Sequence, residues 1–103
     1  AISKNNTVNF KEGMIVSNEP GFYEKNKFGI RIENLIYVKK NKNKTCFENL
    51  TMAPIDKELI DEKILNKNER NWLNGYHKKV FHNLKKFMNK TEVIELRKSC
   101  SAI

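Results

Sequence analysis

The sequence predicts a small α+β domain in which strands come first and helices follow. Residues 14–55 alternate apolar and polar side chains between turn signals, whereas residues 57–100 carry apolar side chains at helical spacing. Strands followed by helices are typical of the α+β class. The chain has 103 residues, which suffice for one domain with a modest hydrophobic core.

The strand region divides into three predicted strands separated by polar turns. Pro20 excludes helical geometry for Glu19, and the Pro-Gly pair signals a turn. The polar runs 24–27 and 39–44 supply the other two breaks. The predicted strands are Met14–Glu19, Phe28–Val38 and Thr45–Ile55.

Alternation along the second strand separates its side chains into two faces. One face is mainly apolar and carries Ile30, Ile32, Asn34, Ile36 and Val38. The opposite face carries Arg31, Glu33, Leu35 and Tyr37.

The helical region begins with a short turn or helix at 57–65. Asn66 and Glu69 have the spacing of a capping box, which predicts that a helix starts there. We expect that helix to bury one apolar stripe, made of Trp72, Leu73, Tyr76, Val80, Leu84 and Phe87. We expect a last helix over Thr91–Cys100, whose side chains Val93, Ile94 and Leu96 face inward.

The charge pattern indicates a solvated surface rather than a nucleic-acid site. The formal net charge is +8, but the lysines are mixed with asparagines, and arginine occurs only at positions 31, 70 and 97. Aromatic side chains do not alternate with basic ones, as a base-stacking platform requires. No apolar run approaches the roughly 20 residues of a membrane span, so we expect no membrane partner.

The cysteines and the first residue bear on where the protein is found. Cys46 and Cys100 lack disulfide-framework or zinc-site spacing, and we interpret them as reduced thiols of a cytoplasmic protein. The chain starts with Ala and no signal stretch follows, so we expect a fragment or a processed chain.

Two carboxylates, Glu19 and Glu33, fall within the predicted strand hairpin. A carboxylate on an inner face needs a partner, and three interpretations meet this need. The two side chains form ion pairs with Arg31 or lysines, act as a general acid and base, or share divalent metal ions. The residues alone favour the ion pairs and leave the other two open.

Several stretches in fixed order resemble one known family. GMIVSNEPGFYEKNKFGIRIENLIYV is similar to the end of the catalytic domain of Xaa-Pro aminopeptidases (aminopeptidase P), which are M24-type metallopeptidases with the pita-bread fold. FENLTMAPIDKELID, NERNWLNGYHKKV and ELRKSCSAI resemble later segments of the same domain. The resemblance implies that residues 1–103 form the C-terminal portion of a single catalytic domain, with antiparallel strands followed by helices.

The resemblance also implies roles for individual residues. Glu19 maps to a ligand of one metal and Glu33 to a ligand that bridges two metals, usually manganese. Arg31 maps to a group that supports this centre, and Tyr23 to a side chain just behind the ligands. Phe22 departs from the tyrosine that family members often carry. The implied reaction removes the first residue of a peptide whose second residue is proline.

Family enzymes take two aspartates and one histidine from segments before residue 1. His77 and His82 are expected to be structural or surface residues instead. The isolated chain is therefore expected to bind divalent ions weakly and to lack peptidase activity without its missing N-terminal part. The resemblance also suggests a homodimer to which the long helix contributes.

Two alternatives to this enzyme remain at this stage. One is a non-catalytic pita-bread binding module associated with histones or RNA, which only the basic surface favours. The other is a prolidase-type relative with a different specificity. The presence of Glu19, Glu33 and Arg31 together favours the enzyme, because a binding module has no physical need for buried acids at these positions.

Overall fold

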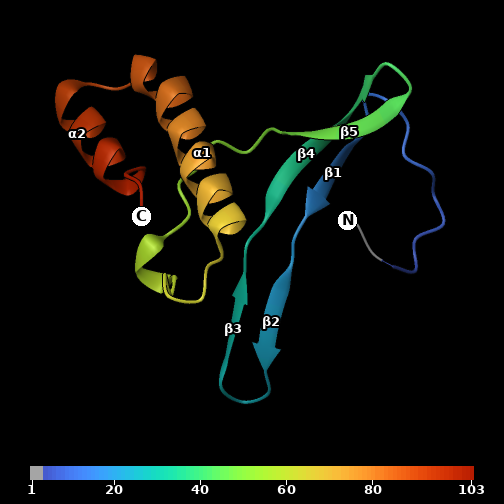
Figure 1. The fold of residues 1–103 in the computed structure, drawn as a ribbon, viewed down its shortest axis with the longest axis horizontal. Coiled ribbons are helices and arrows are strands. Elements are labelled where there is room, and N and C mark those ends of the chain that lie inside the picture. The colour runs from blue at the N-terminus through green and yellow to red at the C-terminus, as the bar shows by residue number, and fades with distance from the viewer. Residues whose placement is uncertain (1–3) are drawn as a thin grey trace. The chain divides into compact units, whose positions relative to one another are not determined.

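A computed structural model describes residues 4–103, which divide into two compact units; the first ends at Thr51 and the second begins at Met52. The first unit contains strands and the second contains helices (Figure 1). The strands are β1 (Ile15–Asn18), β2 (Gly21–Glu24), β3 (Phe28–Arg31), β4 (Asn34–Asn41) and β5 (Lys44–Asn49). The helices are η1 (Lys57–Leu59), α1 (Lys67–Leu84), η2 (Lys85–Phe87) and α2 (Lys90–Ser99).

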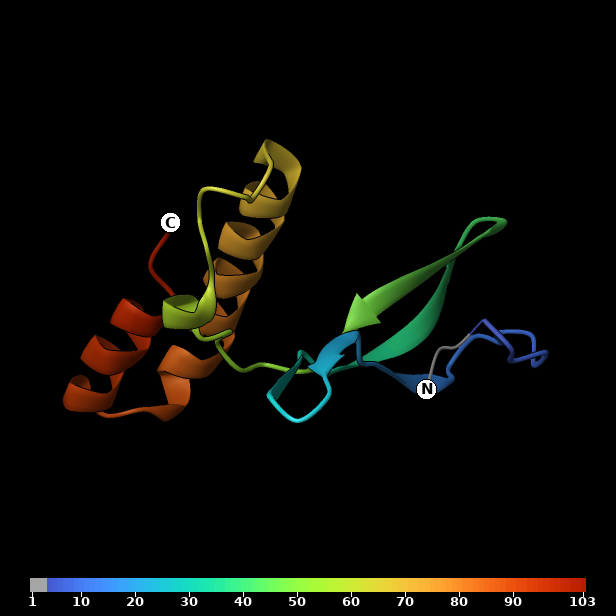
Figure 2. The same ribbon diagram turned by 90° about the horizontal axis from the view of Figure 1, so that it is seen from below.

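The first unit has a three-stranded antiparallel sheet in the order β1-β4-β5 and a two-stranded ladder of β2 and β3. Figure 1 shows β2 and β3 continuing the paths of β1 and β4, and Figure 2 shows the twist of the β4–β5 ribbon. Asn18 pairs with Asn34 in one ladder and Gly21 pairs with Arg31 in the other, so both ladders share one continuous register. The four strands therefore form a single long hairpin.

The predicted strand Phe28–Val38 is interrupted, because Ile32 and Glu33 belong to neither β3 nor β4. Opposite this break stands Pro20, which has no N–H group to donate to the ladder. Its carbonyl still accepts a hydrogen bond from Ile32 N–H at 3.2 Å, so the register survives the interruption.

The predicted third strand ends at Asn49 rather than at Ile55. Beyond Asn49 the backbone finds other partners. Leu50 N–H donates to Leu35 O at 2.8 Å, and Ile55 N–H donates to the His77 ring at 3.0 Å. The segment after β5 is therefore held by tertiary hydrogen bonds, not by a strand ladder.

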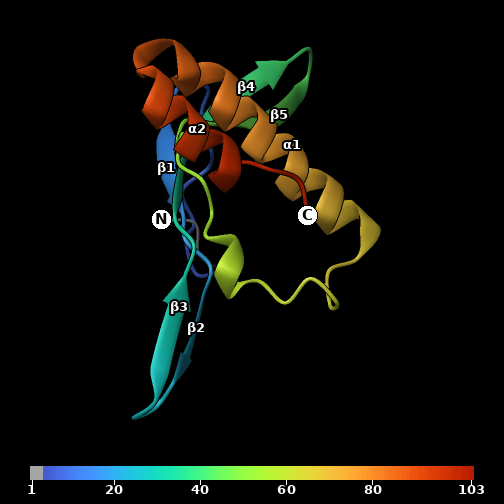
Figure 3. The ribbon, with the colours of Figure 1, turned by 90° about the vertical axis from the view of Figure 1, so that its left-hand side faces the viewer.

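The core of the second unit lies between α1 and α2, which run side by side (Figure 3). The capping box is confirmed: Glu69 N–H donates to Asn66 Oδ1 and Asn66 N–H to Glu69 Oε2, both at 2.9 Å. α2 starts with a second capping box, made by Asn89 and Glu92, which we did not predict. The buried cluster consists of Tyr76, Val80 and Leu96, with half-buried neighbours Met52, Ile55, Phe81, Leu84, Met88 and Cys100.

The predicted helix stripes are correct only in part. Trp72 is 59% exposed and stacks on the Tyr76 ring from outside the core. Phe87 is exposed because α1 ends at Leu84 and η2 changes the helical phase. Ile94 is also exposed, because the face of α2 that packs against the core is the one that contains Leu96.

Among the described residues, no helix combines the length and apolar character needed to cross a bilayer. Both cysteines are free thiols, as the sequence predicts. Burial raises the pKa of the Cys100 thiol above its ordinary value.

Candidate metal centre

Glu19 and Glu33 lie opposite each other at the break in the long hairpin. The continuous register places them there, one step beyond the Asn18–Asn34 pair. Directly opposed residues of antiparallel strands have Cα atoms roughly 4.5 to 5.5 Å apart and side chains on the same face. The fold thus brings together two carboxylates that are fourteen positions apart in the sequence.

Each carboxylate has its own polar neighbour. Ser17 Oγ donates to Glu19 Oε1 at 2.8 Å, and Arg31 Nε lies 3.5 Å from Glu33 Oε2. Glu19 is half-buried and the Glu33 side chain is 46% exposed, so the acids line an open surface in the described part of the chain. The predicted ion pair with Arg31 is present, and it leaves carboxylate oxygens available to other groups.

Arg31 is held by more than this one ion pair. A hydrogen bond with the Tyr23 hydroxyl raises the pKa of the Arg31 guanidinium above its ordinary value, and the charges of Glu33 and Glu19 add to the effect. Tyr23 and Arg31, both predicted to support the site, therefore meet on the face that carries the two acids.

The opposite face of the hairpin is apolar. The rings of Phe22 and Phe28 lie 6.0 Å apart between centroids, and both side chains are more than half exposed. Ile30 and Ile32 are also exposed. The hairpin thus has one charged face and one apolar face.

The residues present fit part of a metal site. Carboxylate oxygens suit hard divalent ions such as Mn²⁺ and Mg²⁺. Among residues 4–103, however, no group of three or more His, Cys, Asp or Glu side chains is arranged to hold a metal ion. Glu19 and Glu33 can supply two ligands, so a complete two-metal site needs further ligands from outside this chain.

Neither histidine belongs to the hairpin. His77 is fully buried in the second unit, where its Nε2 atom accepts the Ile55 N–H. Its neighbour Tyr76 donates a hydrogen bond to the Ala53 carbonyl at 2.7 Å. Through these two hydrogen bonds, side chains of α1 hold the segment that precedes η1. His82 is exposed. The expectation that both are structural or surface residues is confirmed.

Two features of the site were not predicted from the sequence. Ser17 stands two positions before Glu19, and strand alternation alone places both on one face. Gly21 and Gly29 lie under the Tyr23 ring, a contact that no pattern in the sequence indicates.

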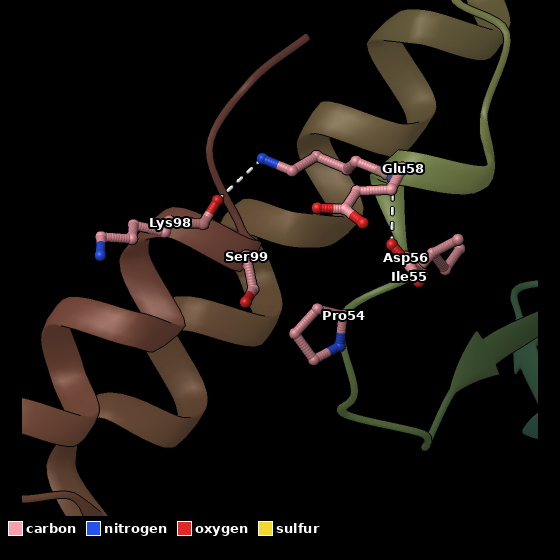
Figure 4. A pocket seen from close by; sticks show the side chains of 7 residues that line it. Pro54, Ile55, Asp56, Glu58, Lys98 and Ser99 are labelled. Carbon is pink, nitrogen blue, oxygen red and sulfur yellow. Dashed lines mark hydrogen bonds between the residues drawn. The ribbon is translucent and has the colours of Figure 1, made fainter.

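The second unit contains a separate cleft of about 440 Å³ (Figure 4). At this cleft Lys57 Nζ donates to the carbonyls of Lys98 (2.8 Å) and Ser101 (3.0 Å) at the end of α2. A cation at the carboxyl end of a helix interacts favourably with the last carbonyls and with the helix dipole, so the role of Lys57 is structural. The cleft is lined by Pro54, Ile55, Asp56, Lys57, Glu58, Lys98 and Ser99.

Comparison with known proteins identifies the class to which this fold and hairpin belong. Residues 44–103 match the family described as the C-terminal region of peptidase M24, and residues 1–40 match metallopeptidase family M24. The chain belongs to the M24 metallopeptidase family. The prediction of an α+β chain from the C-terminal part of a pita-bread domain is confirmed.

Three similar proteins carry names that are more specific than the family. A "Probable Xaa-Pro aminopeptidase P" from Laccaria bicolor is 41% identical, over 99% of this chain and 17% of that protein. One of the same name from Coprinopsis cinerea is 46% identical, over 78% of this chain and 14% of that protein. The crystal structure of X-prolyl aminopeptidase from Caenorhabditis elegans, described as a cytosolic enzyme with a di-nuclear active site, matches with a TM-score of 0.81 and 31% identity, covering 98% of this chain and 18% of that one.

The chain thus spans less than a fifth of the length of these relatives.

Proposed function

We propose that the chain is the C-terminal part of the catalytic domain of an Xaa-Pro aminopeptidase. The proposed enzyme removes the first residue from peptides that carry proline at the second position. The observation that carries the proposal is the placement of Glu19 opposite Glu33 on one face of the hairpin. The names of the related proteins, and the di-nuclear active site of the nematode enzyme, support it.

In this proposal Glu19 and Glu33 are oxygen ligands of two divalent metal ions, preferably Mn²⁺. When bound, two such metal ions would supply a nucleophilic water at neutral pH and would polarise the scissile carbonyl. Ser17 orients the Glu19 carboxylate through its 2.8 Å hydrogen bond. Arg31 orients Glu33, and Tyr23 orients Arg31. These contacts involve one oxygen of each carboxylate and would leave the other oxygen available to a metal ion.

The remaining ligands come from the N-terminal part of the same protein. The 103-residue chain alone therefore binds divalent ions weakly and does not cleave peptides. We place the complete enzyme in the cytoplasm and expect it to form a homodimer.

The test uses the complete polypeptide and follows Mn²⁺-dependent release of the first residue from an Xaa-Pro-Yaa peptide. Glu33→Gln keeps the size of the side chain and removes its charge, so we expect a loss of activity of at least about a hundredfold. Glu24→Gln is the matched control, because Glu24 pairs with Lys27 (2.7 Å) near the hairpin tip and projects to the other face.

Equal activity of the Glu33→Gln variant and the unmodified enzyme would refute the metal-ligand role. A complete protein that is folded, loaded with metal and inactive on such peptides would favour a non-catalytic pita-bread protein instead.

A further inference from the structure

Two glycines of the hairpin lie directly beneath one aromatic ring. A Cβ atom on Gly29 would stand 2.6 Å from Tyr23 Cδ1, and a Cβ atom on Gly21 would stand 2.7 Å from the Tyr23 hydroxyl oxygen. Gly29 is the ladder partner of Tyr23, and Gly21 is the ladder partner of Arg31. The Tyr23 ring therefore lies flat along the hairpin, over two positions that have no side chain.

The backbone at these positions does not itself require glycine. Within residues 4–103, the glycine with positive φ is Gly13, at +85°, whereas Gly21 and Gly29 lie in regular ladder positions. Glycine inside a strand weakens it, because it loses more conformational freedom on folding and offers no side chain to pack. The close approach of the ring is the physical reason for glycine at these two positions.

The flat ring has a consequence at its hydroxyl end. There the hydroxyl lies over Gly21, the ladder partner of Arg31, and its interaction with the guanidinium raises the pKa of Arg31. Arg31 in turn lies 3.5 Å from Glu33. If a side chain at position 29 displaced the ring, the interaction between the hydroxyl and Arg31 would be lost, and the guanidinium would be free to leave Glu33. Within residues 4–103 the ring has room to move outward, because Tyr23 is 64% exposed.

We propose that Gly29 is a positioning residue of the metal centre: its bare backbone lets the Tyr23 ring lie flat and hold Arg31 against Glu33. Gly21, which also lacks a side chain, leaves room for the hydroxyl end of the same ring. The inference rests on the proposed function as far as the metal is concerned. The positioning of Arg31 is a property of this chain's own residues.

The test measures Mn²⁺ affinity by calorimetry on the complete polypeptide. Gly29→Ala is expected to weaken Mn²⁺ binding about fivefold, the factor that corresponds to one ordinary hydrogen bond. The matched control is Gly75→Ala, because a Cβ at Gly75 meets no atom within 4 Å. This control is expected to leave Mn²⁺ affinity unchanged.

A double-mutant cycle separates positioning from a general effect on the strand. When Tyr23→Ala has already removed the ring, adding Gly29→Ala should change Mn²⁺ affinity by less than about twofold. A crystal structure of the metal-free Gly29→Ala variant should show the ring displaced and Arg31 detached from Tyr23.

Wild-type Mn²⁺ affinity in Gly29→Ala, or the same loss with and without the Tyr23 ring, would overturn the proposal. So would a variant structure in which the ring and Arg31 keep their places. If the unmodified protein binds no divalent ion, the proposed function fails, and the variant structure still decides whether Gly29 positions Arg31.

Discussion

His77→Phe tests how the second unit holds the segment before η1. His77 is fully buried, and its Nε2 atom accepts the Ile55 N–H at 3.0 Å. Phenylalanine keeps an aromatic ring of similar size but offers no acceptor, so the Ile55 N–H loses its partner. An unsatisfied buried donor costs roughly 1 to 3 kcal/mol. His77 Nδ1 has no partner within residues 4–103, so the change also removes one unsatisfied atom. We expect a net loss near 1 kcal/mol.

The same substitution should change how stability depends on pH. Burial, followed by the positive charge of Lys57, lowers the pKa of His77 below its ordinary value of 6.5. The unfolded chain then binds a proton more readily than the folded chain, so the contribution of His77 is complete above about pH 6.5 and is lost as the pH falls below it. The slope cannot exceed about 1.4 kcal/mol per pH unit.

Urea unfolding followed by circular dichroism at pH 7.5 and pH 5.5 measures both effects. The His77→Phe variant should be less stable at pH 7.5 and should lose less stability than the unmodified protein on going to pH 5.5. His82→Gln is the control, because His82 is exposed. An unchanged unfolding midpoint at pH 7.5, or an unchanged difference between the two pH values, would refute the reasoning.

Three further substitutions, in a helix cap and at two glycines, are tested by the same unfolding measurement. Asn66→Ala removes the side chain that accepts the Glu69 N–H, and should lower the free energy of unfolding by about 1 kcal/mol. Its control is Asn68→Ala, which lies inside the helix. Gly13→Ala forces a side chain into the left-handed region at φ +85°, and should lower the free energy of unfolding by about 1 kcal/mol. Gly75→Ala, within α1, should raise it by up to about 1 kcal/mol. No loss of stability in Asn66→Ala would show that the cap contributes little, and a stable Gly13→Ala would contradict the strain argument.

Local chemistry explains what the sequence predicts well. The start of α1 follows from Asn66 and Glu69, because both groups act within one helical turn. The pairing of Arg31 with Glu33 follows from strand alternation, because side chains two positions apart share a face. Both features depend on neighbours only three or two residues away.

Features that depend on distant partners escape prediction. The end of β5 is set by the hydrogen bonds of Leu50 and Ile55 to groups on other segments. The exposure of Trp72 depends on where α2 packs, which the period of α1 does not reveal. The opposition of Glu19 and Glu33 requires the register of the whole hairpin, and spacing along the chain does not specify it.

The continuous register limits where this region can gain or lose residues during evolution. Ladders on both sides of the two carboxylates fix their pairing, so an insertion in the turn after Glu24 lengthens the tip without sliding one acid past the other. A single residue inserted between Glu19 and Gly21 would turn the following strand over, and Tyr23 would project from the apolar face. We therefore expect length variation among homologues at the tip of the hairpin and a constant length at its break.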